Sequence, residues 1–329
     1  MNKPQYFIGI GAQKAGTTWL HDLLDSYSEC AVPPVKELHF FDIKYVALEP
    51  GAVRSSELSS RGIYRDRLVA MANMAQGFER AVKAAISAGD GNPSRAAAQR
   101  RDIYQDGYLA KINVDARLKN IERLARYLRI RNSETYLEYL HEVCQRKRAK
   151  VVGEFTPAYS MLPAEAFREI DGLMPGCKFI FIMRDPVDRF LSQIRFKKKR
   201  SENKGKDFDP IAYFDEAIAS PAFLVRSDYR RTIETVESVV GPDRVMYIFF
   251  EEMVGANTLV KTIRGVEQFL GLSPMDESLL AARVEVKKNA SATADFTEEH
   301  KARARKALAG AYEYVEERFG YLPAGWMAG

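Results

Sequence analysis

The chain has 329 residues, of which 46% are hydrophobic and 28% are charged, the balance of an ordinary globular protein with a sizeable core. Its net charge of +5 suits the handling of a small polyanion and is too diffuse to favour nucleic acid as a partner. Cys30, Cys144 and Cys177 are scattered and odd in number, which indicates reduced thiols and a cytoplasmic protein. We expect no metal site, because the histidines and cysteines lack ligand spacing, and no membrane span, because no apolar run is long enough and no leader precedes Tyr6.

The first predicted elements are a strand, a glycine-rich loop and a helix. An apolar run at residues 6–10 is typical of a buried strand, and a helix is expected from Thr17. Glycines between them let backbone N–H groups curl around an anion, and the helix N-terminus adds its partial positive charge. Gly11 and Gly16 fit the nucleotide-triphosphate pattern GxxxxGK(S/T), but Thr17 replaces its lysine. The lysine of this loop is Lys14 instead, which predicts a phosphate site of a different kind, with a plain glycine-rich turn as the alternative.

Residues 33–42 have the sequence PPVKELHFFD, which carries two side chains able to accept a proton, Glu37 and His39. We expect this segment to be extended, so that these residues, two positions apart, point to the same side. For His39 the alternative is a satisfied core histidine in front of the apolar Phe40 and Phe41.

The stretch that follows is predicted to be mainly helical. Apolar residues recur at helical spacing in residues 115–131 and again in residues 133–144, where Ser133 is a candidate helix cap. The sequence GDGNPS at residues 89–94 is a clear break. We predict that residues 45–130 form a helical insertion beside the functional site, which either shapes that site or packs as solvated helices.

A further strand and helix are predicted after this stretch. Residues 178–183 have the sequence KFIFIM, a near-continuous apolar run that is expected for a strand covered on both faces of a parallel sheet. Asp185 can cap the next helix, and Pro186 suits its first turn, which needs no N–H. The apolar stripe of this helix leaves Ser192 on another side and consists of Phe190, Leu191 and Ile194.

Arg184 and Ser192 are candidate phosphate ligands. Arg184 leaves the carboxyl end of the strand, where open α/β sheets place their ligands, and Ser192 lies two turns further along. An arginine fork plus a hydroxyl suits a phosphate monoester. Each residue also has a structural alternative, which is an ion pair with Asp185 or Asp188 for the arginine and a hydrogen bond to a carbonyl one turn earlier for the serine.

Taken in order, these segments resemble the sulfotransferases that use PAPS (3′-phosphoadenosine 5′-phosphosulfate). Residues 14–18 match KxGTT, the 5′-phosphosulfate loop of that family, and residues 184–195 match its 3′-phosphate motif RxPxxRxxSxxR. The stretch KELHFF is similar to the KExHFF of the heparan-sulfate-type and related bacterial branch. Weaker matches follow the family order at residues 151–160 (VVGEFTPAYS), 244–253 (RVMYIFFEEM) and 267–272 (EQFLGL).

The resemblance implies a single α/β domain over residues 1–329, with a P-loop-like central parallel β-sheet flanked by helices and the 45–130 insertion shaping the acceptor site. The donor would be PAPS, and no metal would take part. The family pattern assigns the 5′-phosphosulfate to Lys14, Ala15, Gly16, Thr17 and Thr18, and the 3′-phosphate to Arg184 and Ser192.

The same resemblance assigns catalysis to Glu37 as general base and to Lys14, which would stabilise charge on the departing bridging oxygen. His39 is the rival base, since cytosolic small-molecule sulfotransferases employ histidine, and it is otherwise a candidate contact to the acceptor. The reaction would move a sulfuryl group from PAPS to a hydroxyl or amine of a carbohydrate, lipid or small molecule by in-line displacement.

Three features bear on the acceptor and on closure over the donor. Phe155 stands where heparan-sulfate enzymes commonly have lysine, which argues against a glycosaminoglycan acceptor. The run KKKR at residues 197–200 could meet an acidic acceptor, although charge runs are usually solvated surface. Lys287, Lys288 and Asn289 lie where relatives often have a basic loop over PAPS, but the usual RKGxxGDW form is absent.

Two other functions remain open at this point. A P-loop kinase is disfavoured by the position of Lys14 and by Arg184 preceding Asp185 at the strand end. A non-catalytic PAPS-binding or scaffold protein of the same fold is disfavoured by the presence of both Lys14 and Glu37. Neither the identity of the acceptor nor the oligomeric state follows from the sequence.

Overall fold

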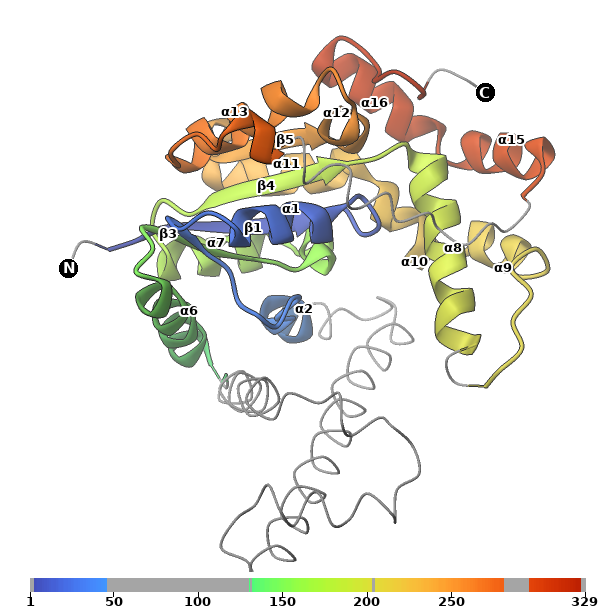
Figure 1. Cartoon of the computed structure of the whole chain (residues 1–329). Coiled ribbons are helices and arrows are strands. Elements are labelled where there is room, and N and C mark those ends of the chain that lie inside the picture. The colour runs from blue at the N-terminus through green and yellow to red at the C-terminus, as the bar shows by residue number, and fades with distance from the viewer. Residues whose placement is uncertain (1–2, 46–129, 131, 203–204, 281–295, 327–329) are drawn as a thin grey trace, which may run out of the picture. The chain divides into compact units, whose positions relative to one another are not determined.

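The computed structural model describes residues 3–45, 130, 132–202, 205–280 and 296–326 (Figure 1). The chain divides into two units, one of Met1–Ala52 with Ile130–Gly329 and one of Val53–Arg129, and every described residue belongs to the first. Four sequence predictions fall outside the described residues and stay predictions: almost all of the 45–130 insertion, the helix at 115–131, the break at 89–94 and the basic positions 287–289.

The described residues contain a parallel sheet of five strands, in agreement with the predicted α/β class. The strand order is β2-β3-β1-β4-β5, and every neighbouring pair is parallel. The strands are β1 (Gln5–Gly11), β2 (Cys30–Ala31), β3 (Val151–Phe155), β4 (Lys178–Met183) and β5 (Val245–Phe249). β4 has the bounds that its apolar run predicts, because a strand covered on both faces requires apolar side chains at successive positions.

Helices cover both faces of the sheet (Figure 1). In this view α1 (Thr17–Asp25) and α13 (Leu259–Leu270) lie in front of the sheet, and α7 (Ala164–Leu173) and α11 (Tyr229–Val240) lie behind it. The described part also contains α2 (Phe40–Tyr45), α6 (Ser133–Lys147), α8 (Pro186–Glu202), α9 (Phe214–Ala219), α10 (Pro221–Leu224), α12 (Phe250–Val254), α15 (Glu298–Ala307) and α16 (Ala309–Phe319). Short 3₁₀ turns occur at Pro157–Met161, Val225–Ser227 and Pro242–Arg244.

The core lies between the sheet and these helices. The middle strands β1, β3 and β4 are buried along nearly their whole length, and Phe7, Ile8 and Phe181 are at most 1% exposed. Burying a side chain of this kind contributes about 1.5–3 kcal/mol to folding. Packing of the core therefore fixes the positions of the carboxyl ends of these strands.

The sheet topology indicates one position at which a ligand is expected. The connection that leaves β1 runs to β2 on one side of the sheet, whereas β4 lies on the other side of β1. The carboxyl ends of β1 and β4 thus form a topological switch point, where open α/β sheets bind their ligands. The loop of residues 12–16 follows β1 at this point, and Arg184 follows β4.

α8 begins as its sequence predicts. Pro186 is the first helical residue, and Asp185 caps the helix because its Oδ1 accepts the N–H of Asp188 at 2.8 Å. The predicted apolar stripe is buried, with Phe190, Leu191 and Ile194 at most 1% exposed. Ser192 is also buried, at 5% exposed, so this half of the helix is covered on more than one side.

α6 begins differently from its prediction. Its N-cap is Asn132, whose side-chain oxygen accepts the N–H of Thr135 at 2.9 Å, and Thr135 bonds back to the N–H of Asn132. Ser133 is the first helical residue, and its hydroxyl donates to Glu169 instead. The prediction of Ser133 as the cap is wrong, because Asn132 takes the extended conformation and the backbone bonds that define that position.

Candidate active site

The loop of residues 12–16 joins β1 to α1 by a tight turn. Gly16 is the N-cap of α1 with a φ of 84°, a left-handed conformation that favours glycine. A Cβ at this position would lie 2.7 Å from the ring of Phe250, so glycine is needed for space as well. Lys14 also has a left-handed backbone, with a φ of 70°. The first N–H groups of an α-helix have no partner within the helix, so the start of α1 offers donors to an anion at this loop.

Arg184 is held against the loop. Its Nη1 donates to the backbone oxygen of Lys14 at 3.2 Å, and its Cζ lies 4.9 Å from the centroid of the Phe250 ring. Its Nη2 lies 3.3 Å from a carboxylate oxygen of Asp188, which is the ion pair named as the structural alternative. That carboxylate is 58% exposed, and exposed pairs contribute little. Within the described part of the chain the Nε of Arg184 is buried without a partner, so the guanidinium keeps capacity for an anion.

The side chain of Lys14 lies among positive charges. Burial lowers the pKa of Lys14, Glu37 raises it, and three nearby cations lower it further, namely Arg184, Lys36 and Lys199. The Lys14 ammonium lies 4.3 Å from the centroid of the Phe196 ring. Positive charges that lie close together repel one another, and a bound anion offsets that repulsion. The surroundings of Lys14 therefore suit a ligand with more than one negative oxygen.

Ser192 lies on a face of α8 that connects these two cations. Asp188, Ser192 and Phe196 are spaced by four residues and therefore share one face of the helix. At one end of this row Asp188 pairs with Arg184, and at the other end the ring of Phe196 contacts Lys14. The structure thus places Ser192 on the helix face that runs from Arg184 to Lys14.

The segment that carries Glu37 and His39 lies along the carboxyl end of β3. The backbone N–H of Glu37 donates to the oxygen of Phe155 at 3.2 Å, and that of His39 donates to Thr156 Oγ1 at 3.4 Å. Glu37 and His39 have φ values of 62° and 54°, which an extended segment does not have. The predicted extended conformation is therefore wrong, because the chain turns to bond to the end of β3 and enters a helix at Phe40.

Glu37 and His39 nevertheless meet, within a line of alternating charges. Lys36 Nζ lies 3.2 Å from Glu37 Oε1, Glu37 Oε2 lies 3.4 Å from His39 Nε2, and His39 Nδ1 lies 2.7 Å from Asp42 Oδ2. Burial disfavours the charged forms, but the charged partners outweigh it: they lower the pKa of Glu37 to about 2 and raise the pKa of His39 to about 10. His39 is therefore an imidazolium at neutral pH, and Glu37 is an ionised carboxylate that can accept a proton.

A second carboxylate near this segment has a structural role. Glu154 on β3 is 1% exposed and accepts hydrogen bonds from Tyr136 at 3.0 Å, from Thr156 at 2.7 Å and from the N–H of Leu38 at 3.4 Å. Burial raises the pKa of Glu154, and the hydrogen bonds oppose that rise. The bond to Leu38 fixes the backbone between the two candidate bases. Glu154 thus holds residues 37–39, which we call the base segment, against the end of β3.

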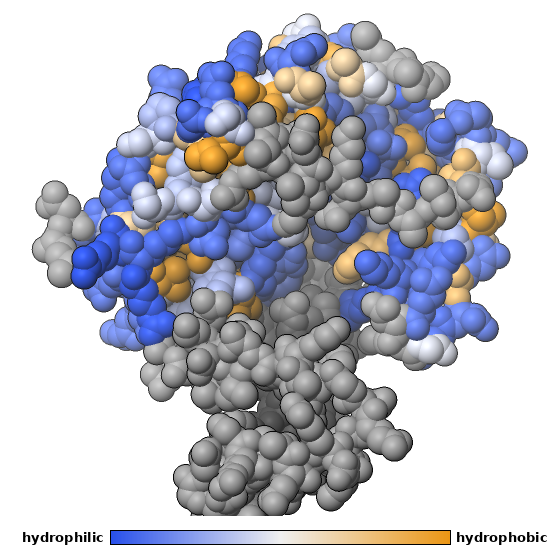
Figure 2. All heavy atoms as spheres, in the orientation of Figure 1, coloured by the Kyte–Doolittle hydropathy of each residue, from blue (hydrophilic) through white to orange (hydrophobic). Residues whose placement is uncertain are grey.

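The features that bear on the acceptor occupy two places. Phe155 is fully buried and packs edge-on against Phe7 and His21, so the position at which heparan-sulfate enzymes commonly have lysine belongs to the core of this protein. Residues 197–200 lie on the second half of α8, where Lys197 stacks on the ring of Tyr213 at 3.4 Å. Figure 2 shows that hydrophilic side chains cover much of this face of the molecule.

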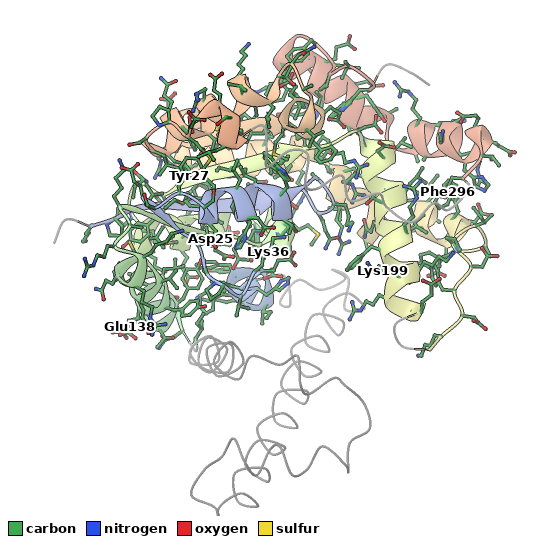
Figure 3. All side chains as sticks on the ribbon, viewed as in Figure 1. Asp25, Tyr27, Lys36, Glu138, Lys199 and Phe296 are labelled. Carbon is green, nitrogen blue, oxygen red and sulfur yellow. The ribbon has the colours of Figure 1, made fainter. Side chains whose placement is uncertain are left out.

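The sequence prediction omitted three side chains of the site. Lys36 directly precedes Glu37 and lies beside α1, and its position next to a candidate base was the available signal (Figure 3). Phe196, 51% exposed, comes four residues after Ser192, a spacing that would have placed both on one helix face. Phe250 lies within a match that indicated only packing.

Among the residues that the structure describes, the His, Cys, Asp and Glu side chains form no group of three or more that could hold a metal ion. No helix in that part of the chain has both the length and the apolar character needed to cross a bilayer. Cys30, Cys144 and Cys177 are all buried and unpaired.

Comparisons with known proteins bear on the family and on the fold. A family model described as "Sulfotransferase family" matches residues 5–277. A sulfotransferase from Alicyclobacillus acidocaldarius has a similar solved structure, with a TM-score of 0.58 and 18% identity over 99% of both chains. The sulfotransferase domain from the curacin biosynthetic pathway gives a TM-score of 0.44 at 13% identity, covering 98% of this chain and 99% of that one. The sulfotransferase domain of the Synechococcus PCC 7002 olefin synthase gives 0.43 at 17% identity, covering 98% and 96%.

No curated protein matches the chain significantly by sequence. The likeness to the Alicyclobacillus structure supports the fold alone, because the identity is low. The family match is more informative, since it covers well over half of the chain and includes the loop, Glu37, Arg184 and Ser192. The chain therefore belongs to the sulfotransferase family.

Proposed function

We propose that this sulfotransferase uses PAPS as its donor and transfers the sulfuryl group to a hydroxyl or amine of a carbohydrate, lipid or small molecule. One observation carries the donor assignment: Arg184 bonds to the backbone oxygen of Lys14, so a cation from the end of β4 meets the loop that follows β1. Both cations lie at the switch point of the sheet, where a nucleotide is expected. A nucleotide with negative groups at both ends of its ribose matches two cationic positions.

Each end of the donor has its own set of proposed ligands. The 5′-phosphosulfate would bind the loop through the Lys14 side chain, the backbone around Ala15 and Gly16 and the hydroxyls of Thr17 and Thr18. Backbone N–H groups at the start of α1 support an anion there. The 3′-phosphate would bind Arg184 and Ser192, because a guanidinium fork and a hydroxyl offer several donors to one phosphate.

In the proposed reaction Glu37 takes the proton of the acceptor hydroxyl as the acceptor oxygen attacks sulfur. A new S–O bond forms while the bond from sulfur to the bridging oxygen breaks in line, and adenosine 3′,5′-bisphosphate leaves with that electron pair. Lys14 stabilises the charge that develops on the bridging oxygen. His39 stays protonated between Glu37 and Asp42 and orients the base, so it is a positioning residue.

We also propose a place near the heparan-sulfate-type and related bacterial branch, because the KELHFF sequence resembles the KExHFF of that branch. The buried Phe155 argues against a glycosaminoglycan acceptor within that branch. We further propose that the protein works in the cytoplasm, because its three cysteines are unpaired and buried, as expected in a reducing compartment.

Incubation with radiolabelled PAPS and fractionated cell extract, followed by identification of the labelled product, tests the function and the acceptor together. The wild-type protein should form one labelled product and adenosine 3′,5′-bisphosphate without added metal. Lys14→Ala should lower the rate by about 10²- to 10³-fold, as expected when one group that stabilises transition-state charge is lost. Glu37→Gln should lower it by about 10²- to 10⁴-fold, because the base is lost.

Three outcomes would contradict parts of this proposal. Near-normal turnover in a folded Glu37→Gln protein would rule out Glu37 as the base. Binding of adenosine 3′,5′-bisphosphate without transfer to any acceptor would support a non-catalytic binding protein. Magnesium-dependent ATP hydrolysis without sulfuryl transfer would support a P-loop kinase.

A further inference from the structure

We call residues 12–16, which lead into α1, the donor loop. Lys36 lies between the end of this loop and Glu37, the proposed base. Its Nζ lies 2.8 Å from Thr18 Oγ1, 3.3 Å from Thr17 Oγ1 and 3.2 Å from Glu37 Oε1. An ammonium has three N–H donors, so these three oxygens occupy all of them. Lys36 thereby connects two hydroxyls on the first turn of α1 with the carboxylate of Glu37.

The present partners of Lys36 do not balance the charge of its surroundings. The two threonine hydroxyls are neutral, and Glu37 is shared with His39. Lys36 also lies among other positive charges. The charges of Lys36, Lys199 and Arg184 all lower the pKa of Lys14. Like charges at close range are unfavourable until an anion enters between them. The position of Lys36 is therefore suited to the oxygens of a phosphate or sulfate.

We propose that Lys36 is a further donor-binding residue, whose ammonium binds the 5′-phosphosulfate of PAPS beside Thr17 and Thr18 and releases Glu37 when the donor is bound. The inference rests on the proposed function and adds a residue to its donor site. The threonines keep their place in this arrangement, because a hydroxyl can accept from an ammonium and donate to a phosphate oxygen at the same time.

If Lys36 moves from Glu37 to the donor, the basicity of Glu37 depends on donor binding. In the free protein His39 and Lys36 both lower the pKa of Glu37, and a carboxylate that is held so low accepts a proton poorly. Transfer of the Lys36 contact from Glu37 to the donor removes one of these two cations from the carboxylate. Glu37 then becomes a stronger base only in the enzyme that already holds PAPS.

Binding of two nucleotides to wild-type and Lys36→Met protein tests the assignment. Adenosine 3′,5′-bisphosphate carries the 5′-phosphate that Lys36 is proposed to bind, and adenosine 3′-monophosphate lacks it. Calorimetry should give a Kd for the bisphosphate that is weaker by roughly 10- to 100-fold in the variant, the range for a lost charge-assisted hydrogen bond. The Kd for the 3′-monophosphate should stay within about twofold of the wild-type value.

Three further variants separate a donor contact from a merely structural one. Lys36→Arg keeps the charge and should restore most of the affinity for the bisphosphate. Lys44→Met is the matched control, because this lysine pairs with Glu169 at 2.7 Å and should leave both Kd values unchanged. In a Glu37→Gln background Lys36→Met should still weaken the bisphosphate, since the proposed contact is with the donor itself.

Equal weakening of both nucleotides, or of neither, in folded Lys36→Met protein would overturn the role of Lys36. Loss of the effect in the Glu37→Gln background would also overturn it, because Lys36 would then act only through the base. If Lys36→Met does not fold, Lys36→Gln removes the charge while keeping an N–H donor, and the same comparison applies. Wild-type protein that binds neither nucleotide would contradict the PAPS donor, a result distinct from the failure of Lys36 alone.

Discussion

Glu37 and His39 are adjacent on the molecule, yet their surroundings shift their pKa values in opposite directions. His39 lies between two carboxylates and holds its proton, whereas Glu37 lies between two cations and gives its proton up. The sequence names both residues but not their protonation, because that depends on Asp42 and on the left-handed backbone that brings the pair together. The same limit applies to Lys36, whose contacts with Thr17 and Thr18 cross a sequence separation of 19 and 18 residues.

The pH dependence of kcat/KM distinguishes the two candidate bases, because this quantity reports groups of the free enzyme. With the pKa of Glu37 at about 2, the wild-type profile should stay flat on the acid side down to the pH where the protein unfolds. In His39→Gln protein one cation is lost, so the pKa of Glu37 should rise toward its ordinary value of 4.5 and an acid limb should appear. A wild-type rate that instead rises with pH toward about 10 would identify His39 as the base.

Turns and helix starts show which features of the structure the local sequence can predict. The start of α8 follows from Asp185 and Pro186, because capping and proline preferences act within one turn. The start of α6 was misplaced by one residue, since Asn132 and Ser133 are both good caps and the contact of Ser133 with Glu169 is made across the fold. The turn at Gly16 combines both kinds of cause, a local left-handed φ and the distant ring of Phe250.

Gly16→Ala should damage the donor loop. The substitution places a Cβ 2.7 Å from the Phe250 ring at a φ of 84°, so we expect a loss of about 1–3 kcal/mol in the free energy of unfolding and weaker binding of adenosine 3′,5′-bisphosphate. Gly172→Ala on α7 is the control, because nothing lies within 4 Å of the added Cβ, and it should be neutral or stabilise by about 0.4–1 kcal/mol. Urea unfolding and calorimetry measure both; equal effects of the two substitutions would refute the steric argument.

Asn132→Ala should destabilise the protein by about 1 kcal/mol, because α6 loses the side-chain acceptor of its first turn. Asn132→Asp retains an acceptor at the same place and should keep most of the stability. Activity should not change in either variant, since the cap lies outside the residues assigned to donor and base. Chemical unfolding with a parallel activity assay checks this; an unaffected Asn132→Ala protein would mean that the cap is elsewhere.

At the scale of the whole molecule, the parallel sheet could be predicted, because it follows from apolar runs and from the order of strands and helices. β4 and the exit of Arg184 from its end are examples. The base segment could not be predicted in the same way, since Glu37 and Leu38 are fixed by bonds to Phe155 and Glu154, more than a hundred residues away. Contacts of that range leave no periodic trace in the sequence.

The line of charges from Lys36 to Asp42 should make the free energy of unfolding decrease at alkaline pH. The pKa of His39 is raised to about 10 from an ordinary 6.5, so the stabilisation is complete below about pH 6.5 and is lost as the pH rises through 10. The difference in unfolding free energy between wild-type and His39→Gln protein should therefore shrink over this interval. Urea unfolding at about pH 6, 8 and 10 measures it; a difference that stays constant would contradict a protonated His39 in the folded state.

The row of Asp188, Ser192 and Phe196 has a consequence for the choice of nucleotide. It spans two turns of α8, about 12 Å along the axis, and its ends contact Arg184 and Lys14. The fixed pitch of one helix thus sets the spacing between the place where Arg184 meets α8 and the place where Lys14 meets it. If PAPS is the donor, as proposed, this spacing favours a nucleotide with charged groups at both ends of its ribose over a nucleoside triphosphate, which is charged at one end only.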